Sequence, residues 1–110
     1  MIDWKRIEEL REEIGADSLV EVADMFLDEA EGAVNALVAG LPKGEIAAQL
    51  HFLKGSALNL GLSDLAMICQ EGERGAAEGN IDPERVAAIF QASRSCLLAW
   101  LSSESVAGAA

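Results

Sequence analysis

Residues 51–61 have the sequence HFLKGSALNLG and form the second half of a predicted amphipathic helix. Apolar residues alternate at spacings of four and three, the pattern of a buried helical stripe, at Ile46, Leu50, Leu53, Ala57 and Leu60. A rotation of about 100° per residue places Gly55 on the opposite, solvent-facing side of this helix, with His51 nearby. The helix therefore presents the single imidazole of the chain beside a patch of bare backbone.

Lys54 lies on the flank of this helix one turn after His51, so an ammonium group accompanies the imidazole. A glycine inside a helix costs about 1 kcal/mol relative to alanine, and nothing in the packing of this helix requires Gly55. We interpret Gly55 as an adaptation to a partner that approaches the backbone beside His51. The sequence has no Asp or Glu from residue 46 to residue 63, although the chain has 19 acidic residues, so we expect this surface to tolerate an anion.

This run resembles the signature of histidine-containing phosphotransfer (HPt) domains, a histidine followed by Leu-Lys-Gly-Ser and then by Asn-Leu-Gly. The residues that match in kind and spacing are His51, Leu53, Lys54, Gly55, Ser56, Asn59, Leu60 and Gly61. The family often has a second small hydroxyl residue where this chain has Ala57, on the core side of the helix. The resemblance implies that His51 is phosphorylated on its distal ring nitrogen and exchanges the phosphoryl group with aspartates of receiver domains.

An exposed imidazole can act as a nucleophile toward phosphorus and become a phosphoramidate. We expect Lys54 to neutralise part of the phosphoryl charge; the alternative is a lysine that covers apolar surface. The residues expected to meet a docking partner are Ala47, Ala48, Gly55 and Leu58, and Leu58 has the alternative of a scattered surface leucine. The residues expected to support the site are Ser56, Asn59 and Gly61, of which Ser56 and Asn59 have the alternative of a purely structural role.

Helix start and stop signals predict helices over about residues 3–14, 18–39, 43–60, 63–79 and 82–101. The start signals are Asp3, a capping box of Ser18 with Glu21, and the pair Asp82-Pro83. The short connection after Gly61 predicts an antiparallel hairpin of the third and fourth helices. We therefore predict an all-α fold, an antiparallel up-down-up-down four-helix bundle with a short accessory N-terminal helix. The expected domain spans residues 1–110, with about 102–110 as a frayed tail.

Composition excludes several classes of function. The chain has 110 residues and a net charge of −11, which argues against nucleic acid or an anionic membrane as a partner. No apolar run is long enough for a membrane span, and no signal peptide is recognised, so we expect a cytoplasmic monomer. Cys69 and Cys96 are expected to be reduced and buried. One histidine and two scattered cysteines give neither a zinc site nor a di-iron site, so no metal is expected.

The sequence shows no kinase or nucleotide-binding segment, so we do not expect an enzyme in the usual sense. The resemblance implies a phosphorelay protein that works with response-regulator receiver domains and a hybrid histidine kinase. It also implies no cofactor of the protein's own, the magnesium being supplied by the receiver. The alternatives are a non-catalytic adaptor that binds a receiver without onward transfer, a purely structural bundle, and an HPt-like bundle that has lost phosphotransfer.

Overall fold

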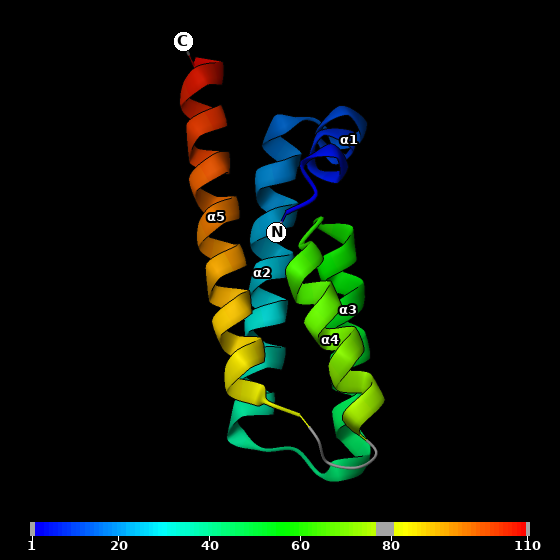
Figure 1. Cartoon of the computed structure of the whole chain (residues 1–110). Coiled ribbons are helices and arrows are strands. Elements are labelled where there is room, and N and C mark those ends of the chain that lie inside the picture. Colours follow the sequence, from blue (N-terminus) through cyan, green and yellow to red (C-terminus); the bar gives the residue numbers. More distant parts are fainter. Residues whose placement is uncertain (1, 77–80, 110) are drawn as a thin grey trace.

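The computed structural model describes residues 2–76 and 81–109, with side chains described through residue 103. These ranges contain five helices and no strand: α1 (Trp4–Ile14), α2 (Ala16–Ala39), α3 (Lys43–Asn59), α4 (Ser63–Ala76) and α5 (Pro83–Ala109). The four helices α2 to α5 alternate in direction along one long axis (Figure 1). The predicted all-α, up-down-up-down four-helix bundle is confirmed.

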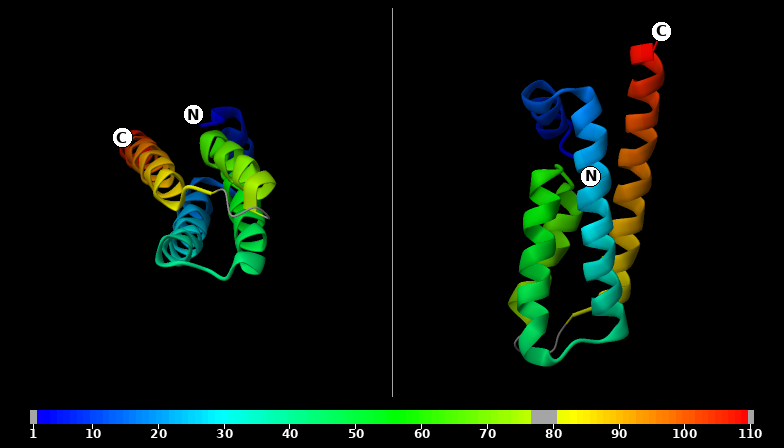
Figure 2. Two further views of the ribbon diagram at one scale, coloured as in Figure 1. Left: turned by 60° about the horizontal axis from the view of Figure 1, so that its bottom comes forward. Right: turned by 180° about the vertical axis from the view of Figure 1, so that it is seen from behind.

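Each of the four long helices packs against two others, which closes the bundle. α3 contacts α2 and α4, and α5 also contacts α2 and α4. The accessory helix α1 packs against α2 at the end of the molecule opposite the α2–α3 connection (Figures 1 and 2). α5 continues as a helix to Ala109. The sequence instead predicts that the helix ends near Leu101 and that a tail follows.

Most helix ends lie where the sequence predicts them, because local capping groups fix them. The Asp3 side chain accepts a hydrogen bond from the Arg6 backbone N–H at 3.3 Å and caps α1. The Asp82 side chain accepts one from the Arg85 N–H at 3.1 Å and caps α5 in the same way. The predicted capping box of Ser18 is wrong, because α2 already begins at Ala16.

The reason for this earlier start is Gly15, which ends α1 and forms the N-cap of α2. Its φ of +86° is a left-handed conformation that reverses the chain within one residue. α2 therefore starts directly after the turn, without a side-chain capping bond, and Ser18 lies inside its first turns.

The predicted apolar stripe of α3 faces the core. Leu50 and Leu53 are fully buried, Ala57 and Leu60 are 1% exposed, and Ile46 is half-buried at the edge. On α4 this stripe packs against a small residue, Gly72. A Cβ added at Gly72 would lie 2.9 Å from Leu50 Cδ1. α3 and α4 therefore approach closely at Gly72, just beside His51.

The α3–α4 turn has the hydrogen bonds of a Schellman motif. The Leu62 N–H donates to the Ala57 carbonyl at 2.7 Å, and the Gly61 N–H donates to the Leu58 carbonyl at 3.2 Å. Gly61 has a φ of +71°, which confirms it as the left-handed residue that ends α3. A Cβ at this position would also lie only 2.7 Å from the Asp3 carbonyl oxygen.

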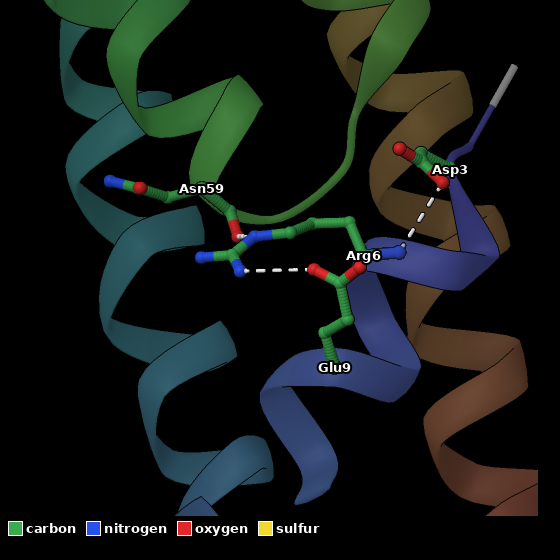
Figure 3. Close-up of polar contacts among 4 residues, drawn as sticks. All are labelled: Asp3, Arg6, Glu9 and Asn59. Atoms are coloured by element: carbon green, nitrogen blue, oxygen red, sulfur yellow. Dashed lines mark hydrogen bonds and ion pairs between the residues drawn. The ribbon is translucent and has the colours of Figure 1, made fainter. Parts of the chain in front are cut away.

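The N-terminal segment is fastened to this same end of α3. The Asp3 N–H donates to the Gly61 carbonyl at 2.6 Å, and Arg6 Nε donates to the Asn59 carbonyl at 3.3 Å. Arg6 Nη1 also forms an ion pair with Glu9 Oε2 at 3.6 Å (Figure 3). A cation at the C-terminal end of a helix satisfies a free carbonyl and complements the helix dipole. α1 therefore serves to fix the end of the helix that carries His51.

Candidate functional site

His51 stands on the exposed side of α3, as predicted. Its side chain is 73% exposed, although the preceding residue, Leu50, is completely buried. Gly55, one turn later, is also exposed, and a Cβ added to it would meet nothing within 4 Å. A protein-sized partner can therefore reach the imidazole without displacing a neighbouring side chain of α3.

Glu73 on α4 contacts both charged groups of the predicted site. Its Oε1 lies 3.4 Å from His51 Nδ1 and 3.2 Å from Lys54 Nζ. Lys54 Nζ also donates a hydrogen bond to Glu73 Oε2 at 3.5 Å. The Lys54 and Glu73 side chains are only 22% and 23% exposed, so this ion pair is partly shielded from solvent while the imidazole is not.

The buried oxygen of Glu73 indicates which ring nitrogen of His51 carries the hydrogen. Oε1 is inaccessible to solvent and receives no aligned hydrogen bond, although two nitrogens lie at ion-pair distance. A buried carboxylate oxygen favours a donor, and a neutral imidazole has one N–H to offer. The contact therefore favours the tautomer with hydrogen on Nδ1, which leaves the lone pair on the distal nitrogen Nε2.

The sequence suggests that no acidic side chain lies near His51, but in the folded structure one does. The segment from residue 46 to 63 contains no acid, but the antiparallel packing of α4 on α3 brings the Glu73 carboxylate to the imidazole. Lys54 is consequently paired in this structure and is not a free cation. The site therefore consists of a nucleophile and two charges of opposite sign, contributed by two helices.

The residues predicted to meet a partner lie on the surface. Ala47, Ala48 and Gly55 are exposed, and Leu58 is 57% exposed. Leu58 follows His51 by two helical turns and faces nearly the same direction. The sequence reasoning did not include Phe52, which is 45% exposed and directly follows His51. Apart from Lys54 and Glu73, these neighbours of the imidazole are thus small or apolar.

The three predicted supporting residues have different surroundings. Ser56 is 7% exposed and faces the bundle interior, whereas the neighbouring Gly55 is exposed. Asn59 is exposed and contributes its backbone carbonyl, which accepts the bond from Arg6 (Figure 3). Gly61 shapes the turn after α3. In this structure all three shape or pack the helix.

Cys69 lies one turn before Glu73 on α4 but is unsuited to nucleophilic chemistry. Burial, with a smaller contribution from the Glu73 carboxylate, raises the pKa of its thiol from 9.0 to about 12, against a lowering effect of Lys54. Such a thiol stays protonated near neutral pH, and only the thiolate is a strong nucleophile. Both cysteines are free, and Cys96 is half-buried, less buried than we expected.

Within residues 2–76 and 81–109, no three His, Cys, Asp or Glu side chains gather as ligands for a metal ion. In the same part of the chain, no helix combines the length and the apolar character needed to cross a membrane.

Comparison with known families gives one match. The family model described as "Hpt domain" matches residues 21–102, which include α3 and α4 with the His51–Glu73 contact. No curated protein matches the chain, and no solved structure does either.

Proposed function

This chain belongs to the Hpt domain family, whose members take part in histidine phosphotransfer in two-component phosphorelays, and we propose that His51 is its phosphorylated residue. In this proposal His51 accepts a phosphoryl group from the aspartate of one receiver domain and passes it to an aspartate of another. The observation that carries the proposal is the exposed imidazole whose Nδ1 faces a shielded carboxylate.

The transfer step follows from the tautomer that Glu73 favours. The lone pair of His51 Nε2 attacks the phosphorus of the receiver's aspartyl phosphate. The Nε2–P bond forms while the bond from phosphorus to the aspartate oxygen breaks, and the carboxylate leaves with the electron pair. The ring then carries a positive charge shared with Nδ1–H. Onward transfer is the reverse of this step with the carboxylate of a second receiver as the attacking group.

Glu73 and Lys54 have complementary parts in this step. The Glu73 carboxylate, 3.4 Å from Nδ1, stabilises the positive charge that develops on the ring. The Lys54 ammonium is held at the same carboxylate, and its flexible stem lets it turn toward the transferred phosphoryl group. Because both charges belong to one ion pair, the site is close to neutral before the phosphoryl group arrives.

The partners follow from the family and from the surface around His51. We propose that receiver domains, including that of a hybrid histidine kinase, dock over Gly55 with Ala47, Ala48 and Leu58 at the contact. The magnesium of the reaction would be supplied by the receiver. The protein would work as a monomer in the cytoplasm, as a carrier and not as an enzyme with its own substrate.

A transfer assay with the His51→Gln variant tests this proposal. A receiver is phosphorylated with labelled phosphate and mixed with either the wild-type protein or the variant, and label on each chain is followed with time. The expected result is acid-labile label on the wild type alone. Gln91→Asn, a change at an exposed position of α5, serves as the control and should accept label normally.

Two outcomes would contradict the proposal in different ways. Equal labelling of the wild type and His51→Gln would show that another residue accepts the phosphoryl group. Binding of the receiver without any label on the wild type would indicate the adaptor function instead.

A further inference from the structure

The helix that carries His51 offers little to hold a free anion. His51 lies in the middle of α3 (Lys43–Asn59), where backbone N–H groups are engaged in intrahelical hydrogen bonds. Its exposed neighbours Phe52 and Gly55 have no polar side chain. Lys43 lies eight residues before His51, about 12 Å along the helix. Any attraction of α3 for an anion at the imidazole therefore depends on Lys54, one turn after it.

Lys54 is already engaged by Glu73 on α4. Its Nζ lies 3.2 Å from Glu73 Oε1 and 3.5 Å from Oε2, so both carboxylate oxygens face the same ammonium. Oε1 is inaccessible to solvent and receives no aligned hydrogen bond. Movement of Lys54 to an anion would take a positive charge away from this buried oxygen, and an uncompensated buried charge is costly. The ion pair therefore opposes recruitment of Lys54 by an anion that brings no cation of its own.

Two kinds of phosphoryl donor differ in this respect. A small phosphorylated molecule presents a doubly negative phosphoryl group, whereas in the proposed function a receiver presents that group together with magnesium. With Glu73 Oε1 3.4 Å from Nδ1, phosphorus at Nε2 is about 7 Å from the carboxylate, and the repulsion in water slows a doubly negative donor about five- to tenfold. Stabilisation of the positive ring by Glu73 acts for both donors alike, so the repulsion alone distinguishes them.

We propose that Glu73 is a specificity-determining residue: it makes His51 accept phosphoryl groups whose charge is already compensated on a protein, and resist free phosphoryl anions. The proposal rests on the proposed function and names the substrate class of the same site, protein-bound acyl phosphates. The residue that makes the distinction lies on α4, outside the motif on α3. The net charge of −11 acts in the same direction at longer range.

Phosphoramidate is the probe for a free donor. His51 Nε2 attacks its phosphorus, the Nε2–P bond forms, and the P–N bond breaks as the protonated nitrogen leaves as ammonia with the electron pair. Rates with phosphoramidate and with a saturating phosphorylated receiver are measured for the wild type and for Glu73→Gln. Because the loss of ring stabilisation slows both reactions alike, the ratio of the receiver rate to the phosphoramidate rate isolates the effect on the anion.

We expect Glu73→Gln to lower this ratio about five- to tenfold at low ionic strength. Glu71→Gln is the matched control, because it removes the same charge from the side of α4 that faces α5, and it should change the ratio less than about twofold. An unchanged ratio in Glu73→Gln, or an equal fall in Glu71→Gln, would overturn the proposal.

Salt gives a second measurement that needs no receiver. Raising the ionic strength from about 0.01 M to about 0.15 M shortens the Debye length from about 30 Å to about 8 Å. The phosphoramidate rate of the wild type should therefore rise relative to that of Glu73→Gln, and parallel salt profiles would contradict the repulsion. Receiver-dependent label on His51→Gln, or none on the wild type, would instead contradict the proposed function, and the salt comparison would still decide the part of Glu73.

Discussion

Replacement of Glu73 by glutamine tests whether a charge on α4 assists chemistry on α3. The amide keeps an acceptor oxygen for His51 Nδ1–H and is nearly isosteric, so the tautomer is preserved while the negative charge is removed. The carboxylate oxygen lies 3.4 Å from Nδ1. At this distance a full charge pair is worth about 1.2 kcal/mol in water and about 5 kcal/mol at an effective dielectric constant of ~20.

The exposure of the imidazole decides between these limits. With 73% of the side chain exposed, the charge on the ring is screened nearly as in water. A stabilisation of about 1.2 kcal/mol corresponds to about an eightfold change in rate, and a ring that is only partly charged in the transition state gains less. We therefore expect Glu73→Gln to slow phosphotransfer from the receiver to His51 about four- to eightfold, and not to slow the reverse step, in which the ring starts with its full charge.

Rapid mixing with saturating phosphorylated receiver measures this step, because docking no longer limits the rate. Glu71→Gln is the matched control, since Glu71 lies on the same helix but lines the side toward α5. Nitrogen NMR of the ring checks that the tautomer is unchanged. A variant as fast as the wild type, or faster because Lys54 is released toward the phosphoryl group, would refute the role assigned to Glu73. An equal slowing by Glu71→Gln would attribute the effect to net charge.

The remaining predictions concern three other positions. Gly61→Ala should lower the free energy of unfolding by about 2 kcal/mol or more in urea denaturation, because the left-handed φ and the nearby Asp3 carbonyl both oppose a Cβ; an unchanged midpoint would contradict this. Gly55→Arg should leave the helical circular dichroism unchanged but slow transfer from a receiver, and wild-type rates would remove the argument for close approach. The stability due to the neutral Cys69 thiol should be complete below about pH 9 and decline as the pH rises toward 12, because the unfolded thiol ionises first. Cys69→Ala should flatten that decline, and an identical pH profile would show that another group causes it.

The helices were predictable from the sequence because their causes are local. Asp3 and Asp82 cap helices through their own side chains, and Gly61 ends α3 through its own φ. The predicted start of α2 at Ser18 is wrong because Gly15, one turn earlier, already forms the turn between α1 and α2. A capping pattern shows that a helix can begin at a residue, but the chain uses the first position at which the turn can close.

The part of the site that the sequence did not reveal depends on contacts between helices. His51 and Gly55 occur in one motif on one helix face, so their common exposure follows from periodicity, and Lys54 lies on the flank of that face. Glu73 belongs to another helix, and its place beside His51 depends on the register of the α3–α4 hairpin. That register could have been counted outward from the turn at Gly61, but the absence of local acids in the sequence suggested a different electrostatic environment.

The packing of the two helices connects the fold to the chemistry. Leu50 and Gly72 make the close contact between α3 and α4, and the residues that follow them in the chain are His51 and Glu73. A side chain at position 72 would displace Leu50 from a fully buried site and push the two backbones apart there. Because the Coulomb energy falls as the inverse of the distance, the stabilisation of the ring by Glu73 depends on this apolar contact below it. Gly72 in the core and the partly buried Glu73 carboxylate thus act on the same reaction: Gly72 sets the distance, and Glu73 supplies the charge.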